Sequence, residues 1–223
     1  MEKPLYAVLT GDIVKSSRMA SADLKRLPQV LKSIFQSIDA ICKPDTFATQ
    51  YSIFRGDGFQ LITEPTLAIK TWLLIRGGLR AAFPGPLSKS VDAITGIAIG
   101  GVSHLAPNIT ESNGEAFLLS GRLLEELKAP RLTGFASVNQ QINREFNVQF
   151  LLADDIIRRW TTAQSQMVPF LLQSFNQNEI AQATQTRQPT VAAKINAMGW
   201  NAIEAWMIYF TETIEKNSTL FLL

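Results

Sequence analysis

The chain has 223 residues, of which 46% are hydrophobic and 18% charged, and its formal net charge is +2. This composition is typical of a globular protein with a sizeable core, and the charge is too small to indicate nucleic-acid binding by itself. A single cysteine excludes an internal disulfide and a cysteine-rich zinc site, and a single histidine argues against a histidine-based metal site. No secretion signal and no run of about 18 apolar residues is visible, so we expect a cytoplasmic protein without a membrane span.

The first half of the chain predicts alternating strands and helices. A nearly all-apolar run at residues 5–10 predicts a buried strand that is closed by Gly11 and Asp12. Apolar residues at helical spacing predict a helix over residues 21–42, whose firm part begins near Leu27 because Pro28 lies inside the pattern. Residues 49–54 and 59–63 predict a hairpin around Asp57, which is flanked by two glycines that reach positive φ without steric cost.

The next elements extend this core. We expect a helix over residues 65–83, a strand over 91–102, a helix over 114–128 and a strand over 134–138. Glycines in the long strand, Gly96, Gly100 and Gly101, indicate a bulge or a close approach of another backbone. The order β-α-β-β-α-β, followed by a further helix and strand, predicts an α+β fold of the ferredoxin-like type.

The pattern changes after about residue 140, which divides the chain into a strand-containing domain at residues 1–140 and an all-helical domain at 141–223. The helical part predicts one helical stretch over residues 145–174 and an amphipathic last helix over 200–216. Between them, two short helices within about 176–199 are separated by Gln185, Thr186 and Arg187.

These two short helices predict a helix-turn-helix unit, with Ala181, Val191 and Ile195 as packing positions. The second helix would present four residues of types that contact phosphates and base edges: Arg187, Gln188, Thr190 and Lys194. However, Thr184-Gln185-Thr186 replaces the usual leucine-glycine-apolar turn, and two basic residues provide few phosphate contacts. DNA contact and a helical hairpin used for packing or dimerisation therefore both stay open.

Two carboxylates, Asp12 and Asp57, follow apolar runs that this topology places side by side. Two neighbouring carboxylates favour a divalent cation or a shared proton, and Mg²⁺ often takes substrate phosphates as further ligands. Lys15, Ser16 and Ser17 directly follow Asp12 and could donate to such phosphates. On the spacing alone, the simpler interpretation is favoured, in which Asp12 ends a strand and Asp57 is a turn residue.

Four short motifs change this weighting because they occur together in one order. They are Gly-Asp-Ile-Val-Lys-Ser-Ser-Arg at 11–18, Gly-Asp-Gly-Phe-Gln at 56–60, Gly-Ile-Ala-Ile-Gly-Gly at 96–101 and Gly-Glu-Ala-Phe-x-x-Ser-Gly-Arg at 114–122. Together they resemble the SatD family of bacterial cytosolic proteins. They also resemble the catalytic palm of class III nucleotidyl cyclases and, more distantly, GGDEF domains, over roughly residues 5–138.

The resemblance implies a nucleotide site with Mg²⁺ or Mn²⁺. In class III cyclases, aspartates at the positions of Asp12 and Asp57 bind two metal ions, and the loop after the first contacts phosphates. An arginine at the position of Arg122 stabilises the transition state, and Glu111 could stand for the acid that reads the base. Cyclase palms act as dimers with shared sites, so a homodimer is expected by resemblance.

For two arginines, a simpler role than phosphate binding stays open. Arg55 could contact phosphate, or it could pair with Asp57. Arg122 could act on a phosphate, or it could form a helix-surface ion pair with Glu125 or Glu126.

Three positions depart from the related patterns. Leu118 stands where cyclases carry an asparagine that stabilises the transition state, and Ile53 stands where they carry a base-selecting lysine. Gly58 stands where SatD-like proteins often have glutamate. Loss of one transition-state donor typically costs about 10²–10³ in rate, so nucleotide binding is favoured over turnover.

The sequence therefore favours a regulatory protein with a metal-dependent nucleotide-binding palm and a helical domain that contacts DNA or protein. One alternative is an active nucleotidyl cyclase or related nucleotidyl transferase that releases pyrophosphate. The other is a DNA-binding transcriptional regulator whose palm is purely structural.

Overall fold

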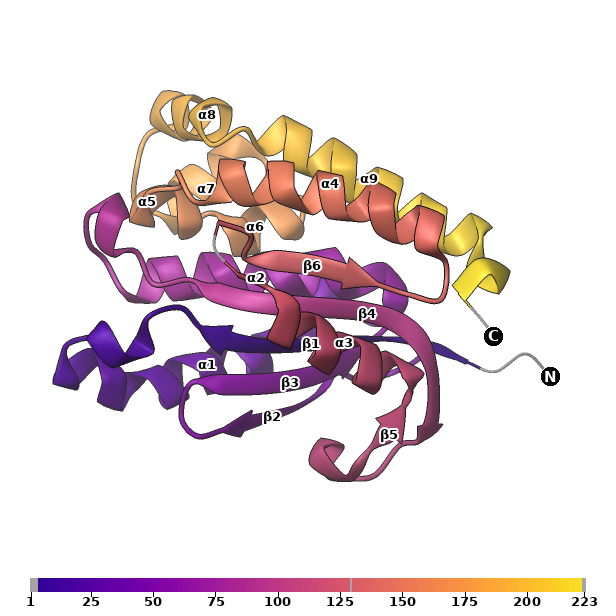
Figure 1. The fold of residues 1–223 in the computed structure, drawn as a ribbon. Coiled ribbons are helices and arrows are strands. Elements are labelled where there is room, and N and C mark those ends of the chain that lie inside the picture. The colour runs from indigo at the N-terminus through magenta and orange to yellow at the C-terminus, as the bar shows by residue number, and fades with distance from the viewer. Residues whose placement is uncertain (1–3, 129, 222–223) are drawn as a thin grey trace.

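A six-stranded sheet forms the centre of the protein (Figure 1), which a computed structural model describes over residues 4–128 and 130–221. Its strands run in the order β2-β3-β1-β4-β5, and β6 also pairs with β4. Among the described strands, β4 and β6 form a parallel pair and the other pairs are antiparallel. The strands are β1 (Leu5–Ile13), β2 (Gln50–Phe54), β3 (Gly58–Thr63), β4 (Ala93–His104), β5 (Asn113–Gly114) and β6 (Thr133–Ala136).

Three helices cover the two faces of the sheet. α1 (Ser21–Cys42) and α2 (Ala68–Ala82) lie on one face, where Leu9 and Ile97 belong to the large hydrophobic core. α3 (Glu115–Glu126) lies on the other face, where Val8 packs with Ala116 and Phe117. The β-α-β-β-α-β order and the strand order β2-β3-β1-β4 agree with the predicted ferredoxin-like arrangement.

Further helices follow β6, and Figure 1 shows α4 and α9 side by side beyond it. They are α4 (Gln140–Ile157), α5 (Thr162–Ser165), α6 (Val168–Leu172), α7 (Gln177–Ala183), α8 (Gln188–Ala197) and α9 (Trp200–Lys216). Short 3-10 helices lie at Ser16–Arg18, Pro65–Leu67, Leu87–Lys89, Ile109–Glu111 and Ser218–Phe221. No described helix is long and apolar enough to cross a membrane.

Three predicted boundaries are corrected by the structure. β1 continues to Ile13, so Asp12 lies within the strand, because the ladder with β4 extends to the Ile13–Ala93 pair. α1 begins at Ser21 and contains Pro28, because its buried stripe outweighs the roughly 3 kcal/mol that an interior proline costs. The expected helical stretch over 145–174 begins earlier, at Gln140, and divides into α4, α5 and α6.

The helices after residue 140 share one hydrophobic core with the sheet. Trp72 of α2 packs against Phe150 of α4 and Trp206 of α9. Trp72 and Phe150 belong to the same buried cluster, and the partly buried Trp206 packs against it. The expected domain boundary near residue 140 thus falls at the start of α4, but one continuous core runs across it.

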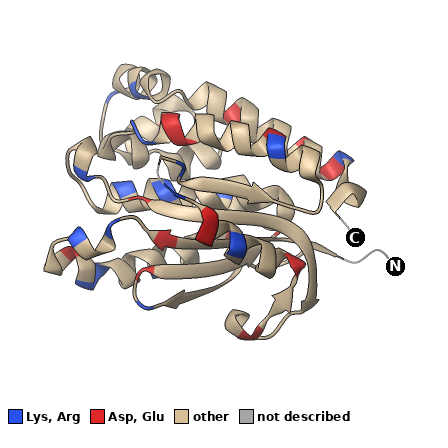
Figure 2. Ribbon diagram, viewed as in Figure 1, with Lys and Arg blue, Asp and Glu red and all other residues tan. Residues whose placement is uncertain are grey.

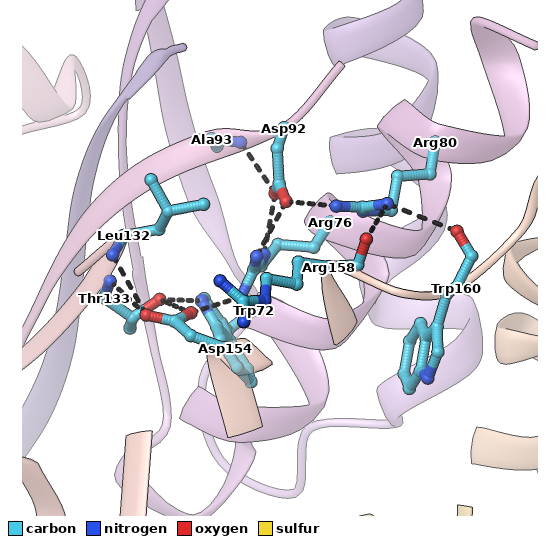
Figure 3. Close-up of polar contacts among 10 residues, drawn as sticks. All are labelled: Trp72, Arg76, Arg80, Asp92, Ala93, Leu132, Thr133, Asp154, Arg158 and Trp160. Carbon is cyan, nitrogen blue, oxygen red and sulfur yellow. Dashed lines mark hydrogen bonds and ion pairs between the residues drawn. The ribbon is translucent and has the colours of Figure 1, made fainter. Parts of the chain in front are cut away.

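A buried ion cluster fastens α4 to the sheet (Figure 3). Arg76 of α2 is fully buried and donates two hydrogen bonds of 2.7 Å to the carboxylate of Asp92, just before β4. It also pairs with Asp154 of α4, which accepts hydrogen bonds from the Leu132 and Thr133 main-chain N–H groups at β6. Burial opposes ionisation of Asp92, but Arg76 and then Arg80 outweigh it and hold the pKa of this carboxyl below its usual value.

Candidate functional site

A three-residue turn joins β2 to β3 and carries Asp57. Phe54 and Gly58 form the last strand pair, and Arg55, Gly56 and Asp57 connect them. Arg55 and Gly56 both have positive φ, at 55° and 88°. Positive φ at two successive residues is typical of the primed hairpin turns, and Gly56 adopts it without strain. The turn therefore fixes Asp57 at the tip of the hairpin.

The end of β1 brings Asp12 next to this turn. Asp12 pairs with Gly58 on one side and with Ile94 on the other. Alternate residues of a strand share a face, so Asp12 lies on the face of Val8, which α3 covers. One oxygen of Asp12, Oδ1, accepts the Ile13 main-chain N–H at 2.9 Å.

The loop after β1 closes over Asp57. Lys15 adopts a left-handed conformation with φ 58°, and the next residue begins a short 3-10 helix. Ser16 Oγ then donates a hydrogen bond of 2.7 Å to Asp57 Oδ2. The contact joins two segments that are 41 residues apart in the chain. The structure thus brings together Asp12, Asp57 and Ser16 of the predicted set.

The electrostatics of the pair disfavour two separate negative charges. The Asp12 side chain is exposed, but its partial desolvation at the end of the sheet raises its pKa above the usual value, and the charge of Asp57 raises it further. The Ile13 main-chain N–H acts in the opposite direction but does not outweigh them. A group whose ionised form is disfavoured in this way gains from a bound cation.

The donor set fits a divalent cation that shares its shell with water and phosphates. Asp12 Oδ2 and Asp57 Oδ1 accept no hydrogen bond from the described residues, so each carboxylate has one oxygen available as a ligand. Over residues 4–128 and 130–221, no three His, Cys, Asp or Glu side chains gather closely enough to hold a metal by themselves. Mg²⁺ commonly binds one or two carboxylates and keeps waters or substrate phosphates as its other ligands.

Replacing Asp12 with asparagine is expected to stabilise the metal-free protein at pH 7 by a few tenths of a kcal/mol. Because the pKa of Asp12 is raised in the folded state, its negative charge lowers the free energy of unfolding. This loss of stability grows as the pH rises from below the unfolded-state pKa, 3.8, through the folded-state pKa. Urea unfolding at pH 7 and near pH 4 measures the difference, which should shrink at the lower pH. Asp45→Asn, at an exposed loop position, is the matched control. A loss of stability in Asp12→Asn at pH 7 would contradict the expectation.

Three other predicted residues lie in or near this loop and turn. Lys15, Ser17 and Arg55 are all exposed. No ion pair joins Arg55 to Asp57, so the structure does not contain the pairing that the sequence left open for Arg55. Its guanidinium is exposed at the tip of the turn.

Arg122 lies on the exposed side of α3 and forms no ion pair with Glu125 or Glu126. The helix itself is held beside β1, because Thr10 Oγ1 and Ser120 Oγ share a hydrogen bond of 2.8 Å. Arg122 therefore belongs to the same side of the sheet as Asp12. It points to solvent rather than to a partner on its own helix.

Glu111 lies toward the opposite end of the sheet. It ends a short 3-10 helix directly before β5, which pairs with the last residues of β4. Asp12 pairs with Ile94 near the first residues of β4, and Val102, eight positions later, pairs with Gly114 of β5. At 3.3 Å per residue this separation is about 26 Å along the strand. Within one chain, the structure does not bring Glu111 to the carboxylate pair.

The residues expected to contact DNA lie on α8 and just before it. Arg187 and Thr190 are exposed, whereas Gln188 and Lys194 are half-buried. Gln188 Nε2 donates to Gln177 Oε1 at 2.5 Å and ties the start of α8 to α7. Figure 2 shows blue and red segments interspersed along the helices rather than gathered by sign. The predicted packing positions Ala181, Val191 and Ile195 are buried.

Sequence reasoning missed the polar row beside Asp12. Gln60 pairs with Thr10 across β3 and β1 and donates to its Oγ1 at 3.1 Å, and Thr10 in turn bonds to Ser120 of α3. The signal was available, because Thr10 and Asp12 are two positions apart and so share a face. Only the register of β3 could add Gln60 to that row.

No protein-family model matches the sequence, and no curated protein sequence matches it either. Among solved structures, an adenylate/guanylate cyclase/hydrolase from Silicibacter pomeroyi is 21% identical, with 57% of this chain and 73% of that chain aligned at a TM-score of 0.43. The catalytic core of a rhodopsin-guanylyl cyclase with converted specificity, in complex with ATPalphaS, is 18% identical over 66% of this chain and 82% of that chain, with a TM-score of 0.43. The monomeric guanylyl cyclase domain of the RhoGC fusion protein from the aquatic fungus Blastocladiella emersonii is 18% identical over 68% and 86%, with a TM-score of 0.41. With TM-scores this low the likeness is loose and carries no argument about function.

Proposed function

We propose that the protein binds a nucleotide through a divalent metal ion, Mg²⁺ or Mn²⁺, at Asp12 and Asp57, and that this binding is regulatory. One observation carries the proposal: the two carboxylates meet where β1 and the β2–β3 turn end, because Asp12 pairs with Gly58, the residue after Asp57. Metal-binding carboxylates are commonly held in this way, each with one oxygen engaged and one available.

The surrounding residues would bind and orient the ligand. Asp12 and Asp57 would hold the ion, whose charge would offset that of the carboxylates and of the phosphates. Ser16 would keep Asp57 in one orientation through its hydrogen bond of 2.7 Å. Lys15, Ser17 and Arg55 are exposed around the pair and would contact phosphate oxygens. Arg122 would add a further positive charge from α3.

A homodimer follows from the proposal if Glu111 takes part. Glu111 is about 26 Å of strand away from the Asp12 end of the sheet, so it reaches the same nucleotide only from a second copy of the chain. A shared site of this kind agrees with the dimer that the motif resemblance implies. Leu118 on α3 is 52% exposed to solvent, and Phe54 at the hairpin is 39% exposed.

The helices α7 and α8 would form the output surface, in contact with DNA or with another protein, as the resemblance to SatD-like chains suggests. The short turn between them supports a helix-turn-helix arrangement, since Gln185 adopts the left-handed φ of 51° at the position where such turns usually carry glycine. The sparse positive charge of α8 favours weak rather than tight DNA contact.

Binding without efficient turnover is the form of the proposal that the side chains favour. Leu118 is 52% exposed on α3 and offers no hydrogen-bond donor where a cyclase would place an asparagine. The enzymatic alternative, a nucleotidyl cyclase or related nucleotidyl transferase, would release pyrophosphate. Equal pyrophosphate release by the wild type and by a variant without the carboxylate pair, across all four triphosphates, would exclude it.

Replacing Asp57 with asparagine is expected to weaken the binding of Mn²⁺ with a nucleoside triphosphate by at least about tenfold, because a hard cation loses a charged oxygen ligand. Titration calorimetry on the full chain with each of the four triphosphates measures this affinity. Asp45→Asn removes the same charge from an exposed loop outside the site and should leave the affinity unchanged. The proposal fails if the wild type binds none of the four, or if Asp57→Asn binds as tightly as the wild type.

A further inference from the structure

A chain of hydrogen bonds connects the buried ion cluster to the candidate site. Asp92 uses its carboxylate to accept two hydrogen bonds from Arg76 and one from Arg80, at 2.7 to 2.8 Å. Its main-chain oxygen accepts the N–H of Val14 at 2.9 Å. Val14 opens the loop whose Ser16 bonds to Asp57. The position of Asp92 therefore sets where this loop leaves the sheet.

The same cluster reaches the far end of the helical layer. Arg80 donates through Nη1 to the main-chain oxygens of Arg158 and Trp160, at 3.3 and 3.2 Å, just after the end of α4 (Figure 3). The indole Nε1 of Trp160 donates to the main-chain oxygen of Met198 at 2.7 Å, and Met198 directly follows α8. The intermediate side chains are buried, with Arg80 at 4% exposure and Trp160 at 1%.

The chemistry of these groups makes the connection stiff. A guanidinium is planar and donates in fixed directions, so Arg80 holds Asp92 and two carbonyl oxygens only in one relative placement. Buried polar groups cannot exchange a lost partner for water, so displacement of one group forces the next to follow.

We propose that Asp92, Arg80 and Trp160 are positioning residues that couple the end of α8 to the loop holding Asp57. In Figure 1, α8 lies in the upper layer of helices and the β2–β3 hairpin at the lower edge of the sheet. The use of this coupling in regulation rests on the proposed function, whereas the coupling itself is a property of the ligand-free chain. A contact that shifts α8 would change the orientation of Asp57, and a ligand at Asp57 would change α8 by the same free energy.

Hydrogen exchange of the full, ligand-free chain tests the coupling. Trp160→Phe keeps an aromatic ring in the core but removes the N–H that bonds to Met198. Loss of one buried hydrogen bond changes local opening severalfold, so we expect the amides of Val14 and Arg18, which donate to the main-chain oxygens of Asp92 and Lys15, to exchange about threefold faster or more. Trp206→Phe is the matched control, because its indole also donates at 2.7 Å, to Gln149, outside this chain of contacts. It should leave the loop unchanged.

The readout separates coupling from general destabilisation. If Trp160 were only a structural residue, exchange would rise equally in the loop and in the central strands, for example at Leu9 and Leu61. The proposal requires that the loop responds more than those strands. Equal exchange of the loop in wild type and Trp160→Phe, or an equal rise in the loop and the strands, would overturn it. Arg80→Lys, which keeps the charge and loses the planar fork, should reproduce the loop effect and serves if Trp160→Phe does not fold.

A second measurement links the coupling to ligand binding. With Mn²⁺ and ATP as the probe, Trp160→Phe should change the affinity by about threefold, and Trp206→Phe should not. If the wild type binds no triphosphate, the proposed function fails, while the exchange experiment still decides the coupling. If the wild type binds and Trp160→Phe shows the wild-type affinity, the link between the coupling and the site is wrong, even where exchange supports the contacts.

Discussion

Replacing Arg76 with methionine is expected to lower the free energy of unfolding by about 3–5 kcal/mol, because it removes one partner from a buried ion pair and leaves the other unpaired. Arg76 is fully buried between Asp92 and Asp154. Methionine fills a similar volume, so the loss would come from the charge and its hydrogen bonds rather than from a cavity. Asp92 would keep its pair with Arg80, and Asp154 would lose the cationic partner that it has among the described residues. Guanidinium unfolding followed by circular dichroism measures the change.

The matched control removes an arginine from a surface pair. Arg158 pairs with Asp155, and both side chains are about half exposed, at 58% and 42%. Arg158→Ala leaves the main-chain oxygen that Arg80 uses, and surface pairs are worth only about 0–1 kcal/mol. A cost below about 1 kcal/mol for Arg76→Met would show that the cluster is not what holds α4 against the sheet.

The stability of the wild type should also depend on pH through Asp92. Asp92 has a folded-state pKa below its usual value, so it contributes stability at pH values above the unfolded pKa. That contribution is lost as the pH falls through the folded value. Acidification should therefore destabilise the wild type more than Arg76→Met, in which the main partner of Asp92 is gone.

The order of elements could be predicted from the sequence because local periodicity determines it. In α9, every third or fourth residue is apolar, and Trp200, Ile203, Met207, Phe210 and Ile214 are all buried. The hairpin was predictable for the same kind of reason, since two apolar runs flank a short glycine-containing turn. The points at which a helix is interrupted are harder to predict. The break after α4 has a local signal, because Thr161 and Gln164 form a capping box.

The ion cluster could not be predicted, because no local pattern distinguishes a buried charge from an exposed one. Arg76 and Arg80 are four positions apart on a helix, which would also suit an exposed face. Their partners, Asp92 and Asp154, become neighbours only when β4 and α4 are in place. The hydrogen bonds at the free edge of β6 could not be predicted either. There, Asn147 of α4 accepts a hydrogen bond from the Phe135 N–H and donates one to the Phe135 carbonyl oxygen. Such tertiary contacts need the whole fold.

For the candidate site, the position of the two aspartates could be predicted from the sequence, but their contacts could not. The expected strand order was enough to place Asp12 beside Asp57. The hydrogen bond from Ser16 to Asp57 depends on the path of a loop, which a left-handed Lys15 turns back toward the hairpin. The distance of Glu111 depends on the length of β4, which extends to His104, two residues beyond its expected end.

Replacing Gly96 with alanine is expected to cost about 2–3 kcal/mol of stability, because the new methyl group would overlap the backbone of α3. A Cβ at this position would lie 2.4 Å from the main-chain oxygen of Ser120 and 3.1 Å from the main-chain nitrogen of Leu124. Neither atom can turn away as a side chain does, so α3 would have to move off the sheet. That movement would strain the hydrogen bond between Thr10 and Ser120.

Gly101 in the same strand provides the control, since a Cβ there would meet nothing within 4 Å. Gly101→Ala should change stability by no more than about 0.5 kcal/mol. The comparison also bears on function, because displacement of α3 would carry Arg122 away from the Asp12 end of the sheet. If Gly96→Ala is destabilised as expected and still binds Mn²⁺ with a triphosphate at the wild-type affinity, Arg122 does not contact the nucleotide. If it is as stable as Gly101→Ala, α3 does not need the close approach that a glycine at this position allows.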